Sequence, residues 1–311
     1  MMNRESISKF AHTFSQNPLN RGETERRDEQ WISDQINNPN SKFMVLHDLN
    51  ILIEETGQRQ SLRWLPQEEI KDLELQSTPV LLGIQDEITH FAISISDASA
   101  SNFIDSDKNE FIDARACASF LEPEIIGIIA QARIQINWHQ KNKFCSVCGE
   151  PNEIYRGGQV LRCSSCKNET FPRTDPVIIM VVTNGNTCLL GQSRGRLSQT
   201  NTYSALAGFM DQGESIEEAV AREVMEEAGL EVKNVTYHSS QPWPFPNSLM
   251  IGCHAEAKTT DIHIDDEEMV SVKWFSKEEV LLALKGENPN LNLPAPIAIA
   301  HHLIKSWAQA T

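Results

Sequence analysis

Alternating hydrophobic and polar positions mark the first third of the chain as rich in strands. The segments KFMVLHDLNILIEE (42–55) and PVLLGIQDEITHFAISIS (79–96) each hold two apolar runs around a polar turn, which predicts two β-hairpins. The polar stretch SDASASNFIDSDKNE (96–110) shows no such alternation and predicts a loop. We therefore expect an α+β domain over residues 1–120, in which no catalytic cluster stands out.

Helical spacing of apolar residues begins at Pro123, a residue type suited to the first turn of a helix. In EPEIIGIIAQARIQINWHQKN (122–142) the apolar residues recur at near-helical spacing, and consecutive apolar pairs predict burial on more than one side. We expect a linker helix over 121–142 that leads into a cysteine-rich segment.

The second half of the chain mixes strand and helix patterns. PVIIMVVTNGNTCLLGQ (176–192) predicts two strands joined by an Asn-Gly-Asn turn. SIEEAVAREVMEEAG (215–229) predicts a helix, because Ser215 and Glu218 can form a capping box and Gly229 can end it. Strands are also expected near 231–238, 248–257 and 270–275, and helices from Ser276 and within 297–309. This order predicts a mixed α/β fold.

Length and charge narrow the classes of function. The 311 residues exceed one typical domain, and the net charge of −16 would repel phosphate backbones unless a metal or a local basic patch intervened. The longest apolar run, VIIMVV (177–182), is too short to span a bilayer, and residues 1–20 lack the apolar core of a secretory signal. We therefore expect a cytoplasmic protein without membrane contact.

Four of the seven cysteines form two Cys-x-x-Cys pairs, separated by fourteen residues that contain a Gly-Gly turn. A hairpin between the pairs would bring four thiolates around one zinc ion, and such a site is structural because no position is left for a reacting water. Unligated thiols would be an oxidation liability, and a redox pair would be expected once rather than twice. We expect a zinc ribbon over 143–170 with one structural Zn²⁺ per subunit, held by Cys145, Cys148, Cys163 and Cys166.

The remaining cysteines and several histidines carry no ligand pattern. The isolated cysteines are interpreted as small buried hydrophobic residues: Cys117, Cys188 and Cys253. Four histidines of the C-terminal half are interpreted as surface residues rather than ligands: His238, His254, His301 and His302.

The helix expected at 215–229 carries three carboxylates on one face, since Glu223 lies three residues before Glu226 and four before Glu227. Like charges at these spacings destabilise a helix by about 0.2–0.5 kcal/mol per pair. A divalent cation such as Mg²⁺ or Mn²⁺ would neutralise them, and bound to pyrophosphate oxygens it would suit phosphoanhydride cleavage. A solvated acidic face is the alternative interpretation.

The segment GFMDQGESIEEAVAREVMEEAGL (208–230) matches the Nudix box G-x5-E-x7-R-E-U-x-E-E-x-G-U, in which U is aliphatic, at every constrained position. The chain thereby resembles the Nudix hydrolases. The resemblance implies an α/β/α sandwich over 171–311, in which the box forms a loop, a helix and a loop. It also implies cleavage of a nucleoside diphosphate linked to another moiety.

The same resemblance assigns roles to residues of the box. Arg222 would orient the carboxylates and Glu214 would support them. The residues implied in catalysis are Arg222, Glu223, Glu226 and Glu227. The residues implied in binding Mg²⁺ or Mn²⁺ are Ala207, through its carbonyl, and Glu223, Glu227 and Glu268. For Glu268 the alternative is membership of a polar acidic turn.

Two further features narrow the resemblance. The ribbon before the box, and SQPWPFPNS (240–248) after it, are similar to the NADH pyrophosphatase family, whose signature S-Q-P-W-P-F-P-x-S is matched at each fixed position. This implies hydrolysis of NADH or NAD⁺ to (reduced) nicotinamide mononucleotide and AMP by a homodimer. The implied substrate contacts are Phe171, Phe209, Gln241, Pro242, Trp243, Pro244, Phe245, Pro246, Asn247, Ser248 and Ala300.

Within this set the aromatic residues are the most informative. The resemblance implies that Phe209 and Trp243 flank the nicotinamide, with Trp243 reaching in from the other subunit, while Phe171 stands where the family often has tyrosine. The three prolines of the 240–248 loop restrict a segment that no helix or central strand could accept, and so lower the entropy cost of presenting rings to a base. For Phe245 the alternative is packing into the protein.

Other functions remain open at this point. The same pocket and bond would serve removal of NAD caps from RNA 5′ ends, or hydrolysis of another nucleoside diphosphate such as ADP-ribose. A binding module on an inactive Nudix scaffold is the alternative from another class, although no box residue is degraded.

Overall fold

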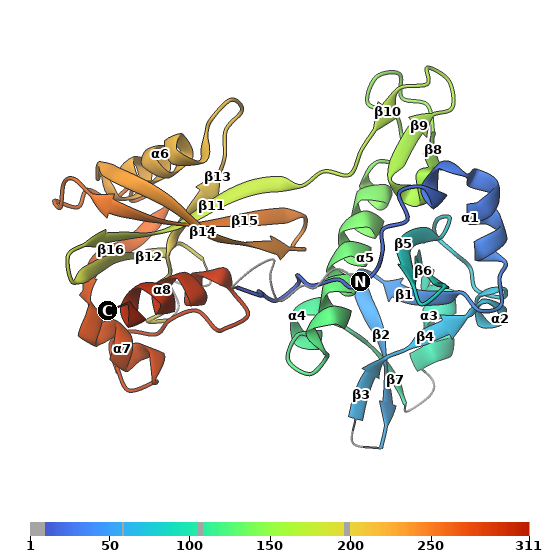
Figure 1. Cartoon of the computed structure of the whole chain (residues 1–311), viewed down its shortest axis with the longest axis horizontal. Helices are drawn as coiled ribbons and strands as arrows, with labels where there is room; N and C mark the ends of the chain where they lie inside the picture. The colour runs from blue at the N-terminus through green and yellow to red at the C-terminus, as the bar shows by residue number, and fades with distance from the viewer. Residues whose placement is uncertain (1–9, 58, 105–107, 196–199, 311) are drawn as a thin grey trace. The chain divides into compact units, whose positions relative to one another are not determined.

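The computed structural model describes residues 10–57, 59–104, 108–195 and 200–310. The chain forms two compact units (Figure 1). The N-terminal unit consists of Thr13–Thr174 and Trp243–Asn247. The C-terminal unit consists of Met1–His12, Asp175–Pro242 and Ser248–Thr311. The chain therefore passes between the units several times. The short segment Trp243–Asn247 belongs to the N-terminal unit, although the residues directly before and after it belong to the C-terminal unit.

The N-terminal unit is built on one mixed sheet of the order β3-β2-β1-β6-β5, with β4 added to β1 and β7 added to β2. Both predicted hairpins are confirmed, since β1 pairs antiparallel with β2 and β5 with β6. The described strands are β1 (Lys42–His47), β2 (Asn50–Thr56), β3 (Arg59–Leu62), β4 (Trp64–Pro66), β5 (Val80–Gln85), β6 (Ile88–Ser94) and β7 (Asn109–Ile112).

Helices flank this sheet. They are η2 (Glu25–Arg27), α1 (Glu29–Ile36), α2 (Gln67–Ile70), α3 (Asp97–Ile104), α4 (Ala114–Cys117) and α5 (Pro123–Lys141). The loop predicted over 96–110 is wrong for α3, because Ala100 and Phe103 pack into the core of the unit and this packing outweighs the weak helix propensity of the serines and Asn102. Residues 105–107 lie outside the described residues.

The long helix α5 confirms the pattern read from Pro123. Pro123 stands in its first turn, and buried side chains such as Ile128, Ile129, Ala132 and Ile136 lie on more than one side of it. The predicted burial on several sides is therefore correct.

The cysteine-rich segment folds as a three-stranded sheet of the order β10-β9-β8. Its strands are β8 (Asn152–Tyr155), β9 (Val160–Cys163) and β10 (Glu169–Thr170), and η3 (Arg156–Gly158) forms the turn between β8 and β9. The buried Arg26 donates hydrogen bonds to the carbonyls of Gly157, at 3.1 Å, and Leu81, at 2.5 Å. This guanidinium ties the turn of the ribbon to strand β5.

The C-terminal unit is a sandwich of one sheet between helices. The sheet has the order β14-β15-β11-β12-β16, with β13 added to β11. The strands are β11 (Asp175–Asn184), β12 (Thr187–Ser193), β13 (Leu206–Phe209), β14 (Val232–Trp243), β15 (Ser248–Ala257) and β16 (Met269–Ser276), and the helices are α6 (Ile216–Ala228), α7 (Lys277–Leu284) and α8 (Ile299–Gln309).

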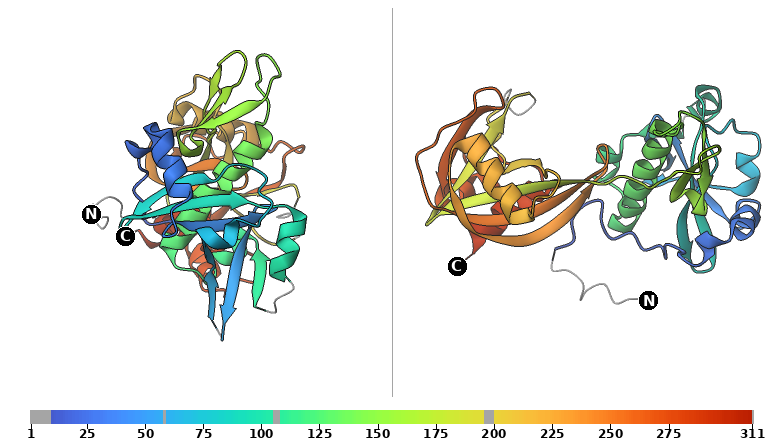
Figure 2. Two further views of the ribbon diagram at one scale, coloured as in Figure 1. Left: turned by 90° about the vertical axis from the view of Figure 1, so that its right-hand side faces the viewer. Right: turned by 90° about the horizontal axis from the view of Figure 1, so that it is seen from above.

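Strand β11 explains the continuous apolar run near residue 180. Ile178 and Met180 join the core beneath α6, whereas Ile179 and Val181 join the core beneath α7 and α8. A strand covered on both faces needs apolar residues at successive positions. Figures 1 and 2 show α6 on one side of this sheet and α7 and α8 on the other, so the predicted mixed α/β fold is confirmed.

The strand predicted near 231–238 extends farther than expected, through Pro242 to Trp243. Strand β14 lies at the edge of its sheet, where a proline does not remove a ladder hydrogen bond from both neighbours. The expectation that no central strand accepts this proline-rich run therefore stands. Within the described part of the chain, no helix has the length and apolar character needed to cross a membrane.

Candidate active site

The box helix α6 is fixed at both ends by its own sequence. The backbone N–H of Glu218 donates to Ser215 Oγ at 3.2 Å, and the N–H of Ser215 donates to Glu218 Oε2 at 2.8 Å. Gly229 ends the helix in the left-handed conformation with φ 68°. These two caps set the register in which the glutamates face the sheet.

The glycine that opens the box is required by close approach. A Cβ atom on Gly208 would lie 2.0 Å from the carboxyl group of Glu223. Strand β13 therefore brings bare backbone against the carboxylate, and any larger residue would displace it.

Arg222 organises the acidic side chains around it. Its Nε and Nη2 donate to the two carboxylate oxygens of Glu214 at 2.6 and 2.9 Å, as a bidentate pair. Its Nη1 donates to Glu223 and Glu226, both at 2.8 Å, and its Nη2 also donates to the Phe209 carbonyl at 2.9 Å. Hydrogen bonds from Arg222 hold the pKa of Glu214 at about 2. The guanidinium of Arg222 thus fixes the box loop to helix α6.

The three carboxylates predicted to share a face differ in exposure. Glu223 and Glu227 are 8% and 7% exposed, whereas Glu226 is exposed. Burial, with the nearby charges of Glu223 and Glu268, raises the pKa of Glu227 to about 8. Burial also raises the pKa of Glu223, against the lowering effect of Arg222. A buried carboxyl beside two others is costly unless a cation joins it.

These residues fit a divalent cation. Among the described residues, Glu227 Oε2 is buried without a hydrogen-bond partner. Glu268 is exposed, in the turn before β16, and is close enough to raise the pKa values of both Glu223 and Glu227 by its charge. A hydrogen bond from the backbone of Ala207 lowers the pKa of Glu227, so Ala207 also adjoins this carboxyl. Oxygen atoms of this kind are the ligands that Mg²⁺ and Mn²⁺ prefer.

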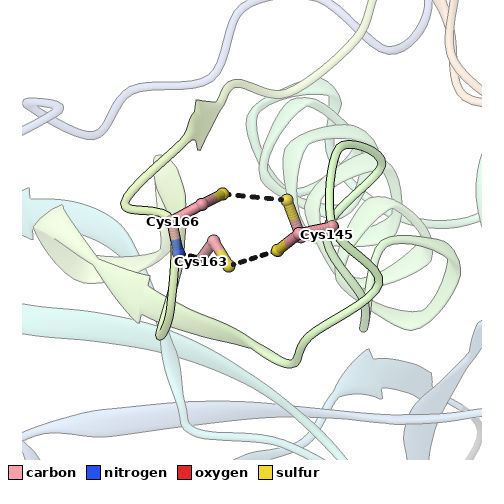
Figure 3. Close-up of side chains that lie close together, drawn as sticks. Cys145, Cys163 and Cys166 are labelled. Carbon is pink, nitrogen blue, oxygen red and sulfur yellow. Dashed lines mark hydrogen bonds between the residues drawn. The ribbon is translucent and has the colours of Figure 1, made fainter.

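The four ribbon cysteines form a much tighter group (Figure 3). The Sγ atoms of Cys145 and Cys166 lie 3.7 Å apart, and those of Cys148 and Cys163 lie 3.4 Å apart. Within the described part of the chain, the sets whose three or more candidate ligand atoms all lie within 4.8 Å of one another are these cysteines and an exposed group of His47, Asp48 and Asp97. The box carboxylates are not gathered to that degree.

Backbone amides prepare the ribbon sulfurs for a cation. The N–H groups of Ser165 and Cys166 both lie 3.4 Å from Cys163 Sγ. Burial opposes the thiolate, but these hydrogen bonds and the neighbouring thiols lower the pKa of Cys163 to about 6. The thiolate is the form that binds zinc. The predicted hairpin and the clustering of the four ribbon cysteines are confirmed, and the other three cysteines are buried as expected.

The aromatic residues expected at the substrate lie on different units. Phe209 is 62% exposed at the end of β13 in the C-terminal unit. Phe171 is 59% exposed in the N-terminal unit, where it lines a cavity of about 550 Å³ together with Arg27, Tyr155 and Arg162.

Gln241 and Ala300 meet at the start of α8. The side chain of Gln241 is buried, donates to the Ile297 carbonyl at 2.8 Å and accepts from the Ile299 N–H at 2.7 Å. Ala300, the next residue of α8, is buried as well. Both amide atoms of Gln241 thereby shape the first turn of the helix, and Ser248 is buried where β15 begins.

The tip of the proline-rich loop packs against aromatic and basic residues of the N-terminal unit. Phe14 meets the rings of Trp243 and Phe245 edge to face, at 5.8 and 5.4 Å between centroids. Trp243 is half-buried, Pro244 is buried, Pro246 is exposed, and Asn247 Nδ2 donates to the Arg173 carbonyl at 3.2 Å. Phe245 thus takes the inward packing that was its alternative. Phe14 and the two arginines that lie over the Phe245 ring, Arg115 and Arg133, belong to no sequence motif, so the sequence offered no signal for them.

The fold and the clamped carboxylates define a hydrolase of the Nudix class. Comparison with known families extends this over most of the chain. Residues 172–293 match the NUDIX domain, residues 140–171 match the NADH pyrophosphatase zinc ribbon domain, and residues 40–138 match the NADH pyrophosphatase-like rudimentary NUDIX domain.

Curated relatives agree with these matches. The "NAD-capped RNA hydrolase NUDT12" of Macaca fascicularis is 34% identical over 344 aligned residues, covering 97% of this chain and 74% of that protein. The mitochondrial "NAD(P)H pyrophosphatase NUDT13" of Mus musculus is 36% identical over 303 residues, covering 86% and 84%. A crystal structure of a NUDIX hydrolase from Nitrosomonas europaea has a TM-score of 0.43 at 20% identity, covering 54% of this chain and 90% of that chain. The chain belongs to the NUDIX family, in the branch with an NADH pyrophosphatase zinc ribbon.

Proposed function

We propose that the protein hydrolyses the central pyrophosphate bond of NADH or NAD⁺ to (reduced) nicotinamide mononucleotide and AMP. The observation that carries the chemistry is the buried Oε2 atom of Glu227, which has no hydrogen-bond partner among the described residues and lies beside the carboxylates that Arg222 holds in place. The names of the relatives, a hydrolase of NAD-capped RNA and an NAD(P)H pyrophosphatase, support the choice of substrate.

In this proposal Glu223, Glu227, Glu268 and the Ala207 carbonyl would hold Mg²⁺ or Mn²⁺, which would supply charge neutralisation and an activated water for pyrophosphate cleavage. Glu223, Glu226 and Glu227 form the set that positions the water or accepts its proton. Arg222 acts on this set rather than on the substrate, because its guanidinium is engaged by Glu214, Glu223 and Glu226.

The base-binding part of the proposal rests on the remaining predicted contacts. Phe209 offers an exposed ring directly after the box glycine, and Trp243 offers a half-buried ring at the loop. We propose that Phe209 of one subunit and Trp243 of the other subunit of a homodimer flank the nicotinamide, and that Phe171, Gln241, the rest of 242–248 and Ala300 complete the contacts. Two rings that face a planar base each contribute about 1–3 kcal/mol to its binding.

Product analysis tests the proposal most directly. Pure protein incubated with NADH and Mg²⁺ should yield reduced nicotinamide mononucleotide and AMP in equal amounts, resolved by chromatography. Release of free nicotinamide with ADP-ribose would contradict it, because that would place cleavage at the glycosidic bond. Substituting Mn²⁺ in the same assay decides which metal serves.

Removal of NAD caps from RNA 5′ ends is a second candidate, favoured by the name of the Macaca relative. The bond broken is the same. Since the chain carries a net charge of −16, the RNA body should add little to affinity and the cap should dominate. Turnover of NADH and of a capped transcript, compared at equal concentration and fixed salt, decides between them. Failure to cleave either would refute both.

Assembly, location and domain limits also remain proposals. We propose a homodimer, which light scattering of the purified protein can test. We propose a cytoplasmic location, which fractionation of the native cells can test against the mitochondrial location in the name of the mouse relative. The predicted domain limits of 1–120, 143–170 and 171–311, with the linker helix 121–142, can be tested by limited proteolysis.

A further inference from the structure

Arg133, on helix α5, holds the tip of the proline-rich loop. Its Nε donates to the Pro244 carbonyl at 2.9 Å, and its Nη1 donates to the carbonyl of Leu49 in the turn between β1 and β2. Its guanidinium carbon lies 5.0 Å from the centroid of the Phe245 ring. One side chain therefore joins the loop tip to both a helix and a turn of the N-terminal unit.

The loop needs such an external donor because its own sequence removes hydrogen bonds. Prolines at 242, 244 and 246 have no N–H, so the segment between them can donate through the backbone only at Trp243 and Phe245. The Phe245 N–H is used locally, since it donates to the Trp243 carbonyl at 2.8 Å. Carbonyl groups are therefore the main backbone atoms through which the protein can hold the tip, and Arg133 takes the one at its centre.

The surroundings of Arg133 make this contact a specific one. Burial lowers the pKa of Arg133, and the neighbouring Arg115 lowers it further, while Asp113 acts in the opposite direction. Arg115 also lies over the Phe245 ring, with its guanidinium carbon 3.5 Å from the centroid. A half-buried cation beside another cation costs free energy that carbonyl acceptors and an aromatic face must offset. The loop supplies one such acceptor, the Pro244 carbonyl, and the aromatic face of Phe245.

We propose that Arg133 is a positioning residue for substrate binding, which fixes Pro244 and Phe245 so that the Trp243 ring is presented in one orientation. This inference rests on the proposed function, in which Trp243 contacts the nicotinamide. It also gives the N-terminal unit a part in substrate recognition, although that unit contains none of the box carboxylates. Trp243 and Phe245 lie 5.2 Å apart between centroids, so loss of the Phe245 anchor should free the indole.

The kinetic test compares Arg133→Met with a matched arginine. Arg63→Met is the control, because Arg63 also donates two hydrogen bonds and lies over a phenylalanine, with Asn109, Glu69 and Phe103 as partners. We expect Arg133→Met to raise KM for NADH about tenfold with kcat within about twofold, since the chemistry lies elsewhere. Arg63→Met should change neither constant. An unchanged KM in Arg133→Met would overturn the proposal.

A double-mutant cycle separates positioning from a general effect on the unit. In a Trp243→Ala background, Arg133→Met should add less than about twofold to KM, because both changes remove the same contact. Full additivity would overturn the proposal. If Arg133→Met does not fold by circular dichroism, Arg133→Lys carries the cycle, since lysine keeps the charge but cannot donate to two carbonyls and stack at once.

A ligand-free measurement distinguishes failure of this inference from failure of the proposed function. The Trp243 contribution is obtained by subtracting the fluorescence of the Trp243→Phe variant from that of the same protein with Trp243 in place. Acrylamide should quench that difference more strongly in Arg133→Met than in the parent protein. Equal quenching overturns the positioning role whatever the substrate is, whereas stronger quenching in a protein that does not cleave NADH would overturn the substrate alone.

Discussion

The ribbon cysteines and the box carboxylates are both sets of like-charged ligands, yet the protein builds them differently. The cysteines lie on two neighbouring turns, with Sγ atoms 3.4–3.7 Å apart in pairs, and backbone amides favour the thiolate of Cys163. The carboxylates lie farther apart, and the fold opposes the charge of two of them by burial. Arg222 holds one buried and one exposed member, which leaves Glu227 for a ligand from outside. We call the four ribbon cysteines the closed set, because they can fill all the positions around one zinc ion and so contribute to stability. We call the box carboxylates the open set, because Glu227 keeps an oxygen atom without a partner that could bind a cation.

Among these variants, Cys163→Ser in the zinc ribbon should produce the largest effect, a loss of zinc and of thermal stability. Structural zinc sites contribute about 10–16 kcal/mol of apparent binding free energy, so loss of one thiolate should abolish zinc retention and lower the melting temperature of the N-terminal unit by many degrees. Zinc content by atomic absorption and thermal unfolding measure both. Cys117→Ser, at a buried cysteine outside the ribbon, should retain the zinc. Full zinc occupancy in Cys163→Ser would contradict the four-ligand assignment.

Glu227→Gln tests the box carboxylates, and we expect it to reduce turnover rather than stability. We expect kcat to fall about 10³-fold, or about 4 kcal/mol, because the amide cannot neutralise a cation or accept a proton. The stability of the metal-free protein should not fall, since burial raises the pKa of the parent carboxyl to about 8 and keeps it largely neutral at pH 7. Turnover of NADH and the melting temperature measure the two effects.

The matched control for that variant is Glu217→Gln, at an exposed glutamate in the first turn of the same helix. It should leave kcat unchanged. Equal losses in both variants would show that the net charge of α6, rather than the position of Glu227, governs the reaction.

Gly208→Ala tests how the box carboxylates are kept in place. The added Cβ would lie 2.0 Å from the Glu223 carboxyl, and the group that must move is the end of a flexible side chain. We therefore expect kcat/KM to fall about 10²-fold, or about 3 kcal/mol, with little loss of stability. Gly252→Ala in strand β15 is the contrast, because its Cβ would meet Ile299 and Leu303 and should affect stability rather than turnover. A fully active Gly208→Ala enzyme would contradict the requirement for close approach.

The two sets also show which parts of the structure the sequence could predict. The ribbon and the box helix are specified by spacings within 22 and 23 residues, respectively, and hairpin and capping rules suffice to place them. Contacts such as Phe14 with Trp243, or Arg133 with Pro244, join residues more than one hundred positions apart and depend on the packing of whole units. Helix α3 was missed for the same reason, since core packing outweighed its polar composition.

A group of histidines was also missed, because they are dispersed along the sequence. His12, His238, His254 and His302 gather in the C-terminal unit, with ring centroids 4.9 Å apart for His12 and His302 and 5.1 Å apart for His238 and His254. The interpretation of His238 and His254 as surface residues is wrong, because both side chains are half-buried on strands β14 and β15. His254 Nε2 lies 3.1 Å from the Leu303 carbonyl, and His238 Nδ1 lies 2.7 Å from Ser239 Oγ.

The histidine group offers the smallest and sharpest contrast with the two ligand sets, because burial lowers the pKa of His12, His238 and His254 and so favours their neutral forms. Burial, with the charges of His254 and His302, lowers the pKa of His238 from 6.5 to about 4. The unfolded chain then binds more protons between those values, so this contribution to stability is complete above pH 6.5 and is lost as the pH falls towards 4. Allowing for its partial exposure, we expect His238→Asn to gain about 1 kcal/mol relative to the parent between pH 7.5 and 5.0. Urea unfolding at the two pH values measures this change, and His263→Asn, at an exposed histidine, is the control. A difference that does not vary with pH would show that folding does not lower the pKa of His238.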